Sequence, residues 1–142
     1  MIRNYKHPDD AAAIWELVSN DLGYVQTTKE ACLKQMEKIA NHHDYHTFVY
    51  VEDQAIIGFA GTLLCYAYEN DDCYARLAAL AVQADKRGKG VGTRLLQHVE
   101  SFAKKQGCTD ITLSSGMHRE KAHLFYENQG YFKKGYSFLK KL

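Results

Sequence analysis

An unbroken apolar run that leads into a glycine-rich turn is the feature that most constrains how this chain folds. Residues 77–82 read LAALAV, as in a strand that is buried on both faces. The turn at residues 87–93 reads RGKGVGT, and apolar residues then recur at helical spacing over residues 91–106. We therefore expect a strand, a tight turn and an amphipathic helix in succession.

Helical and strand patterns also divide the rest of the chain. Strands are expected at residues 2–5, 47–52, 55–68, 73–82, 111–113 and 137–142, and helices up to residue 20 and at residues 28–41, 91–106 and 119–128. Asp53 and Gln54 mark a tight turn between two strands. The strand–helix–strand crossover in the last half is expected to be parallel and right-handed. This order predicts a mixed sheet with helices on its faces.

Length and charge limit the class of protein. A chain of 142 residues fits one domain, which we place at residues 1–142. The net charge of +1 gives no polybasic footprint for nucleic acid or for an anionic membrane. No apolar run approaches the roughly 20 residues of a membrane span, and the N-terminus lacks the apolar region of a signal peptide. We expect a cytoplasmic protein.

The cysteines and histidines show no metal-ligand spacing. The four cysteines form no CxxC pair. Cys65 and Cys73 could face each other across a hairpin, although free thiols are the simpler expectation in a reducing compartment. His42 and His43 are adjacent, so a helix would point them in different directions. We expect no metal site, and whether Cys65 and Cys73 pair stays open.

The glycine turn suits an anionic ligand. The first amides of a helix have no intrahelical partner and lie at the positive end of the helix dipole. Gly88, Gly90 and Gly92 let the backbone approach phosphate oxygens closely. Arg87 and Lys89 add positive charge. A glycine-rich connection with solvated basic residues explains this stretch equally well when it is considered alone.

Two nucleotide-binding motifs are excluded by their spacing. A P-loop places a lysine after its last glycine and directly before serine or threonine, whereas here Lys89 precedes Gly90. The dinucleotide fingerprint is Gly-x-Gly-x-x-Gly, whereas glycine recurs here at every second position. A different phosphate-binding family is therefore needed to explain the turn.

With those motifs excluded, the sequence resembles the GNAT superfamily of N-acetyltransferases. Arg87, Gly90 and Gly92 match the family signature Gln/Arg-x-x-Gly-x-Gly/Ala, between an apolar strand and an amphipathic helix. Residues 122–131, AHLFYENQGY, match a second family pattern, Ala-x-x-Phe-Tyr-x-x-x-Gly-Phe/Tyr. Residues 114–142 resemble the branch that contains aminoalkylphosphonate and some aminoglycoside acetyltransferases.

The resemblance implies a fold and a donor site. The fold is α+β, layered α/β/α, with a mixed, mostly antiparallel sheet, a central parallel strand pair and flanking helices. Acetyl-CoA is the acetyl donor, whose pantetheine arm meets the strand before the turn and whose pyrophosphate meets the turn. The implied cofactor-binding residues are Leu80, Ala81, Val82, Arg87, Gly88, Lys89, Gly90, Val91, Gly92 and Thr93.

The resemblance also places Tyr126 at the family's usual general acid. A thiolate leaves when an amine attacks the thioester, and a phenol can protonate it, while the Val82 N–H would meet the oxyanion. No general base carries over, because Ala78 and Ala79 stand where many relatives have glutamate. Other candidates for the base are Glu69, Asp71, Asp72, His118 and His123.

The implied activity is acetyl-CoA-dependent N-acetylation of a primary amine of a small molecule, by direct attack on the thioester. One alternative is a non-catalytic CoA-binding sensor or partner module, which the missing glutamate motivates. Another is a peptide or protein N-acetyltransferase. An RNA- or peptide-binding domain lacks the expected basic patch with interleaved aromatic residues. A homodimer is expected by analogy with the fold, and the sequence does not identify the acceptor.

Overall fold

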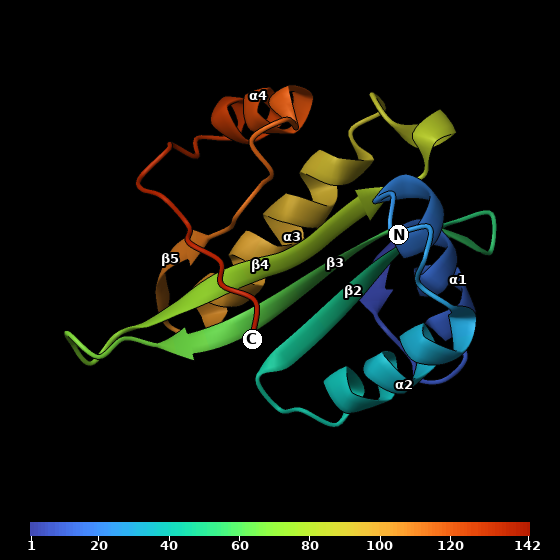
Figure 1. Ribbon diagram of the computed structural model, residues 1–142, viewed down its shortest axis with the longest axis horizontal. Helices are drawn as coiled ribbons and strands as arrows, with labels where there is room; N and C mark the ends of the chain where they lie inside the picture. The colour runs from blue at the N-terminus through green and yellow to red at the C-terminus, as the bar shows by residue number, and fades with distance from the viewer. The chain divides into compact units, whose positions relative to one another are not determined.

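A computed structural model describes residues 1–142, which form two compact units, Met1–Thr112 and Leu113–Leu142 (Figure 1). The first unit contains β1 (Ile2–Asn4), α1 (Ala11–Glu16), the π-helix η1 (Leu17–Asp21), α2 (Lys29–Ala40), β2 (Tyr45–Glu52), β3 (Ala55–Tyr66), β4 (Cys73–Val82), the 3-10 helix η2 (Ala84–Lys86), α3 (Val91–Lys105) and β5 (Cys108–Thr112). The second unit contains α4 (Glu120–Asn128). None of the helices combines the length and the apolar character needed to cross a bilayer.

The first unit is built on one five-stranded sheet in the order β1-β2-β3-β4-β5. Neighbouring strands are antiparallel from β1 to β4, whereas β4 and β5 are parallel. The helix α3 connects the two parallel strands, because such a pair needs a long crossover. The expected mixed, mostly antiparallel sheet with a parallel strand pair is confirmed, and this pair lies at one edge of the sheet, because β5 has no further neighbour.

Helices cover both faces of this sheet (Figure 1). Val49 on β2, Phe59 on β3 and Ala81 on β4 belong to a buried cluster with residues of α1 and α2. Phe48 precedes Val49 and therefore points to the opposite face, where its ring centroid lies 5.2 Å from that of Phe102 on α3. Alternate strand residues thus build one core against α1 and α2 and another against α3.

The helix α3 packs closely on the sheet because β3 has a glycine at the contact. A Cβ atom at Gly58 would lie 2.9 Å from the Ala81 carbonyl oxygen and 3.2 Å from a methyl carbon of Leu95. Val91, Leu95 and Val99 of the expected apolar face are all buried. This packing fixes the position of the N-terminus of α3, where the glycine turn ends.

Local residues determine two boundaries between elements. Thr28 caps α2, since its Oγ1 accepts a hydrogen bond from the Ala31 amide at 3.1 Å. Asp53 and Gln54 have φ angles of 49° and 65°, as in the type I′ turns that join antiparallel strands. These residues set where α2 begins and where β2 turns into β3.

The strand β4 is not buried on both faces, contrary to the expectation from its apolar run. Ala78 is exposed, and the two residues after it are only half-buried. The register with β3 shifts between Gly61 and Thr62, and Ala78 is the β4 residue that is left without a partner. Such a β-bulge bends the strand locally, so that part of the apolar run lies uncovered.

The strand expected at residues 137–142 is absent, and that prediction is wrong. Residues 131–142 contain neither helix nor strand. Their large apolar side chains that are exposed are Phe132, Tyr136, Phe138, Leu139 and Leu142. A strand persists where a neighbouring strand takes its backbone hydrogen bonds, and a favourable residue pattern does not supply that neighbour.

Candidate functional site

The glycine turn joins β4 to α3 through a backbone that favours glycine. Gly88 and Gly90 have φ angles of +74° and +80°, a region in which residues with side chains are strained. Gly90 directly precedes α3, and no side chain caps this end of the helix. The N-terminus of α3 is therefore open to an acceptor from outside the chain.

Consecutive amides of the turn have no backbone partner. The first bond into α3 runs from the Arg94 amide to the Gly90 carbonyl, at 3.0 Å. The amides before it that donate to no backbone acceptor are those of Gly88, Lys89, Gly90, Val91 and Gly92. A row of exposed donors at the positive end of a helix suits an anion with several oxygens, such as a diphosphate.

Asp21, the last residue of η1, holds the turn from a distant part of the sequence. Its Oδ1 accepts a hydrogen bond from the Ala84 amide at 2.9 Å. Arg87 donates from Nη2 to the backbone oxygen of Asp21 and from Nε to that of Val82, each at 3.0 Å. The guanidinium also lies 3.7 Å from the Asp21 carboxylate. Arg87 therefore holds the backbone of the turn in place, and the Asp21 carboxylate partly neutralises its positive charge.

Sequence reasoning misses Asp21. The helical pattern predicts one continuous helix that ends near residue 20, whereas the structure has α1 followed by the π-helix η1. A π-helix changes which face a residue presents, and it often occurs at functional sites. Because 63 positions separate Asp21 from Ala84, no local signal could have revealed their bond.

Lys89 is the basic residue of the turn whose charge remains available. Lys86 lies 3.4 Å from Glu52, and Arg94 donates to the Tyr50 hydroxyl at 3.2 Å. Lys89 is exposed and takes part in none of the ion pairs. Its ammonium group can therefore add to the attraction that the turn amides exert on an anion.

The end of β4 presents backbone groups away from β3. The Gln83 amide donates a hydrogen bond to the Ile57 carbonyl at 2.9 Å. Val82 and its partner Gly58 therefore form a non-hydrogen-bonded pair of the β3–β4 ladder, in which the backbone N–H points away from the partner strand. The N–H of Val82, and by alternation that of Leu80, therefore points toward the β5 side. The last pair between β4 and β5 contains Arg76, so β5 does not cover these groups. The pairing of β4 with β5 thus ends before β4 reaches the turn.

Tyr126 lies on α4 in the second unit and is half-buried. Its ring centroid is 5.2 Å from that of Phe125 and 5.8 Å from that of Tyr131. Burial raises the pKa of Tyr126 above its ordinary value of 10.0, and Arg119 offsets this in part. The phenol is therefore protonated at neutral pH, as a proton donor must be.

The geometry favours none of the candidate bases. His123 has its Nε2 at 2.8 Å from the Gly116 carbonyl oxygen. A carbonyl only accepts, so this nitrogen carries the hydrogen and donates it. The remaining candidates are all exposed, and they are Glu69, Asp71, Asp72 and His118. The three acidic residues lie at the tip of the β3–β4 hairpin, at the end of β4 opposite to the turn.

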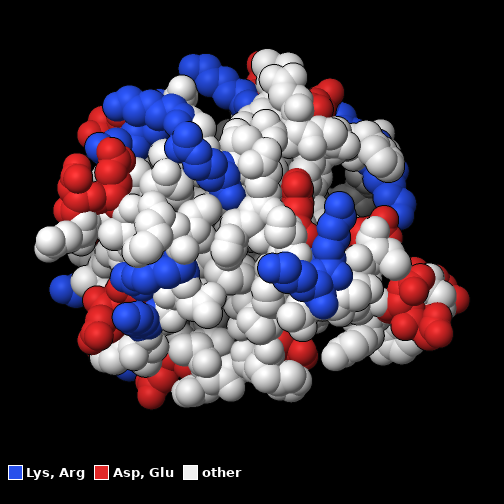
Figure 2. Space-filling model, turned by 180° about the vertical axis from the view of Figure 1, so that it is seen from behind, with Lys and Arg blue, Asp and Glu red and all other residues white.

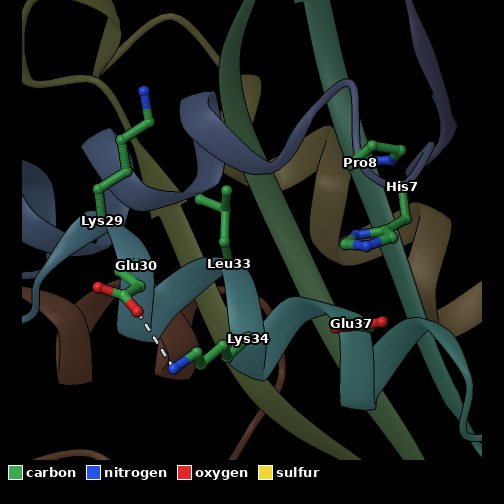
Figure 3. A pocket seen from close by; sticks show the side chains of 7 residues that line it. All are labelled: His7, Pro8, Lys29, Glu30, Leu33, Lys34 and Glu37. Carbon is green, nitrogen blue, oxygen red and sulfur yellow. Dashed lines mark ion pairs between the residues drawn. The ribbon is translucent and has the colours of Figure 1, made fainter.

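Two grooves of the first unit lie away from the turn. One of about 560 Å³ runs along α2 and is lined by residues that include His7, Leu33 and Glu37 (Figure 3). The other, of about 700 Å³, lies by the end of α2, β2 and α3, and it includes His46 and His98. Burial lowers the pKa of both histidines. No residue of the glycine turn lines either of these two grooves.

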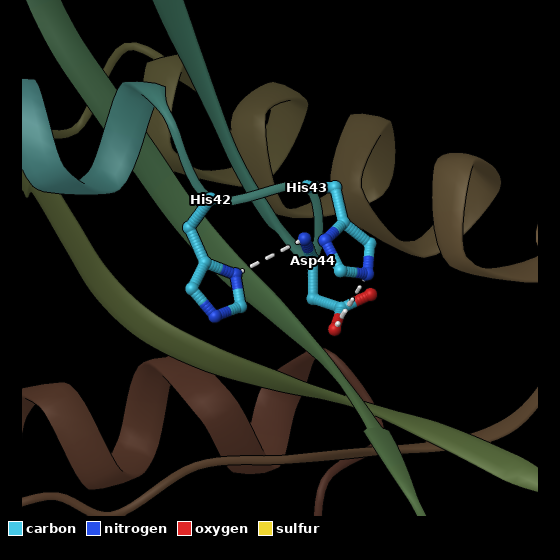
Figure 4. Close-up of side chains that lie close together, drawn as sticks. All are labelled: His42, His43 and Asp44. Atoms are coloured by element: carbon cyan, nitrogen blue, oxygen red, sulfur yellow. Dashed lines mark hydrogen bonds and ion pairs between the residues drawn. The ribbon is translucent and has the colours of Figure 1, made fainter.

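Three side chains with metal-ligating atoms gather in the turn after α2 (Figure 4). One such atom from each of His42, His43 and Asp44 lies within 4.8 Å of the others. The two rings stack with centroids 5.6 Å apart, since α2 has ended at Ala40 and no longer directs them apart. His42 Nδ1 already accepts from the Asp44 amide, at 3.2 Å, and both rings are exposed. We assign no metal to this surface turn.

Charges of both signs are mixed over the face seen in Figure 2. Lysine and arginine side chains lie there among acidic and uncharged residues, and no extended basic surface is visible on that face. The net charge of the chain is +1. This face therefore lacks the electrostatic footprint that nucleic-acid-binding domains present.

Comparison with known proteins finds acetyltransferases among the relatives of this chain. The profile of the acetyltransferase (GNAT) family matches residues 11–131. An uncharacterised N-acetyltransferase of Bacillus subtilis (strain 168) is 31% identical over 112 residues, which cover 78% of each chain. The aminoalkylphosphonate N-acetyltransferase of Salmonella typhimurium is 24% identical over 131 residues, covering 92% of this chain and 82% of the relative. The crystal structure of a GNAT family acetyltransferase from Staphylococcus aureus matches with a TM-score of 0.81 and 28% identity, over 100% of this chain and 98% of the other.

Proposed function

The chain belongs to the GNAT family of acetyltransferases, and we propose that it transfers the acetyl group of acetyl-CoA to a primary amine of a small molecule. Membership of the family makes it an N-acetyltransferase, and acetyl-CoA is the donor that this family generally uses. The observation that carries the proposal is the row of amides at residues 88–92 that have no backbone partner. A CoA pyrophosphate supplies the acceptor oxygens that such a row needs.

The pyrophosphate is the part of the donor that the turn fits. The helix N-terminus and the exposed Lys89 both favour negative charge. Arg87 contributes by holding the backbone that carries the amides. The residues proposed to bind the pyrophosphate are Arg87, Gly88, Lys89, Gly90, Val91, Gly92 and Thr93.

The pantetheine arm is assigned to the end of β4 that lies beyond its pairing with β5. This arm contains amide groups, which can pair with a free strand edge as an added peptide strand would. We assign it to Leu80, Ala81 and Val82, because this end of β4 lies beyond its last pair with β5. The outward N–H of Val82 is the group that we assign to the oxyanion of the reaction.

The proposed reaction is a direct attack of the amine nitrogen on the thioester carbon. A carbon–nitrogen bond forms, negative charge develops on the carbonyl oxygen, and the carbon–sulfur bond then breaks. We assign Tyr126 as the group that protonates the departing thiolate, because its raised pKa keeps the phenol protonated. The attacking nitrogen meanwhile loses a proton.

No side chain of this chain is assigned as the base that takes this proton. Ala78 and Ala79 stand where many relatives have glutamate. A lysine-like amine with a pKa of about 10.4 loses its proton at pH 7 at a cost of roughly 4.6 kcal/mol. We propose that the proton leaves through water, because the exposed acidic residues of the β3–β4 hairpin lie at the opposite end of β4.

Several broader features complete the proposal. We propose a single domain over residues 1–142, which the family match across both compact units supports. Relatives named for aminoalkylphosphonate and aminoglycoside acetylation favour a small amine as acceptor.

The exposed apolar side chains of residues 132–142 favour a homodimer. The four free cysteines favour the reducing cytoplasm.

A second candidate function is a non-catalytic CoA-binding module, which the missing glutamate favours. To distinguish the candidate functions, the protein is incubated with acetyl-CoA and with one amine at a time from a panel of polyamines, aminoglycosides, aminophosphonates, amino acids and a peptide. Released CoA is then measured by chromatography. CoA release with a small amine supports the proposed function, and release with the peptide alone supports a peptide acetyltransferase. Binding of acetyl-CoA without release by any amine supports the binding module.

A further inference from the structure

Cys73 and Cys108 lie side by side at the start of the parallel strand pair. They are the first residues of β4 and β5 and form the first pair of the register. Their Sγ atoms are 3.2 Å apart, although the residues are separated by 35 positions. Cys65, the other partner considered for Cys73, stands instead opposite Tyr74. The two thiols in contact are therefore those of Cys73 and Cys108.

The backbone places this pair within the range of a disulfide. Paired residues of neighbouring strands have Cα atoms about 4.8–5.5 Å apart. Disulfides span Cα separations of roughly 4.4–6.8 Å, and their sulfurs are about 2.05 Å apart. The two sulfurs therefore need to approach by only about 1.2 Å. Rotation of the side chains can supply this approach without movement of the strands.

We propose that Cys73 and Cys108 are an oxidative modification site, at which a peroxide forms a reversible intramolecular disulfide. In the first step the Cys73 sulfur attacks the peroxide bond, which gives a sulfenic acid and one water. In the second step the Cys108 sulfur attacks the oxidised sulfur of Cys73, which forms the sulfur–sulfur bond and releases a second water. The two thiols lose two electrons and two protons, and hydrogen peroxide is reduced to two waters.

The surroundings of the two sulfurs set the order of these steps. Burial raises the pKa of Cys108 to about 12, and the hydrogen bond with Cys73 adds to this effect. A thiol that stays protonated is a poor nucleophile toward peroxide. Cys73 therefore reacts first, and Cys108 resolves the intermediate because its sulfur is already in contact.

The crosslink closes a loop that contains β4, the glycine turn and α3. Closing this loop restricts the unfolded chain and thereby stabilises the folded one. The bond fixes the paired ends of β4 and β5 and leaves their other ends, beyond Arg76 and Thr112, unconstrained. This inference does not depend on the proposed acetyl transfer.

Peptide mapping of the full chain tests the proposed link. The protein is treated with stoichiometric hydrogen peroxide, and the remaining thiols are then alkylated under denaturing conditions. We expect the intact chain to lose two hydrogen atoms, two of the four cysteines to be alkylated, and one peptide to join Cys73 to Cys108. Dithiothreitol should reverse all three changes. Four alkylated cysteines, or a link between any other pair, would overturn the proposal.

Serine variants give matched controls for the same experiment. Cys73→Ser and Cys108→Ser should form no link, whereas Cys65→Ser should form it as the unaltered chain does. Oxidation should raise the Tm of the unaltered chain and of Cys65→Ser by about 5–10 °C. Should a serine variant not fold, the unaltered chain and Cys65→Ser still decide the question. A link without any rise in Tm would contradict the stabilising role.

Discussion

The carboxylate of Asp21 accepts a hydrogen bond from the Ala84 amide at 2.9 Å, and 63 positions of sequence separate the two residues. The side chain of Asp21 is only 12% exposed, and it also faces the guanidinium of Arg87. These contacts order the glycine turn before any ligand arrives. A site that is ordered in advance loses less conformational freedom on binding, so its affinity is higher.

Replacing Asp21 should therefore weaken both the fold and the binding of the donor. Asp21→Ala leaves the Ala84 amide without its partner and should lower the free energy of unfolding by roughly 1.5–3 kcal/mol. The Kd for acetyl-CoA should rise roughly tenfold, as the turn loses its anchor. Urea unfolding and calorimetric titration measure the two effects. Asp85→Ala, an exposed neighbour in η2, is the control, and an unchanged Kd in Asp21→Ala would show that the anchor is dispensable.

Gly90→Ala tests the amides at the N-terminus of α3. A residue with a Cβ at a φ of +80° is strained by roughly 1–2 kcal/mol, and the strain should displace the amides that meet the pyrophosphate. Gly107, just beyond the other end of α3, has a φ of +86° and open space around it. Gly107→Ala should lose similar stability but retain its affinity for acetyl-CoA. Equal loss of affinity in both variants would argue against a role for the turn.

Tyr126→Phe tests the proton donor. Removal of a general acid typically slows a reaction by about 10²–10⁴-fold, so kcat should fall while KM for acetyl-CoA changes little. The raised pKa predicts that activity persists with rising pH until above the ordinary tyrosine value of 10.0, where the donor loses its proton. Steady-state kinetics across pH measure both effects. Tyr136→Phe, an exposed position, should behave as the unaltered chain, and an unchanged kcat in Tyr126→Phe would remove it from the mechanism.

The pair of Arg3 and Asp10 predicts a pH dependence of stability. Arg3 donates to both carboxylate oxygens of Asp10, at 2.6 and 3.0 Å, and the Lys6 amide donates at 2.7 Å. The hydrogen bond from Arg3 is the main cause that lowers the pKa of Asp10 below 3.8. The stabilisation is therefore complete above the unfolded-state pKa and is lost as the pH falls through the folded-state pKa.

Asp10→Asn keeps the shape of the side chain and removes its charge. At pH 7 the substitution should lower the free energy of unfolding by roughly 1–3 kcal/mol. The difference from the unaltered chain should shrink progressively below pH 4, as urea unfolding at pH 7, 5 and 3 would show. Asp9→Asn, at an exposed position, is the control. A difference that stays constant down to pH 3 would mean that the charge of Asp10 does not act as described.

Features that depend on neighbouring residues could be predicted from the sequence. The start of a helix near residue 28 and the turn at Asp53 and Gln54 follow from local residue preferences, and both are confirmed. The mixed sheet and its parallel strand pair follow from the succession of elements. Short-range stereochemistry determines such features, so the pattern of residues suffices to predict them.

Features that depend on distant contacts could not be predicted. The bond of Asp21 to Ala84 and the contact of Cys73 with Cys108 each join residues far apart in the sequence. The prediction of a closing strand at residues 137–142 was wrong for a related reason, because the sequence of a segment does not supply the strand that must pair with it. The bulge at Ala78 likewise arises from register with β3 and not from local preference.

Calorimetric titration of acetyl-CoA into the full chain tests the central claim most directly. We expect saturable binding at one site per chain, with an affinity that falls in Gly90→Ala and in Asp21→Ala but not in Gly107→Ala. Pantetheine, which lacks the pyrophosphate, should bind far more weakly than CoA. Absence of binding at millimolar acetyl-CoA, or equal affinity for CoA and pantetheine, would contradict the assignment of the glycine turn as the pyrophosphate site.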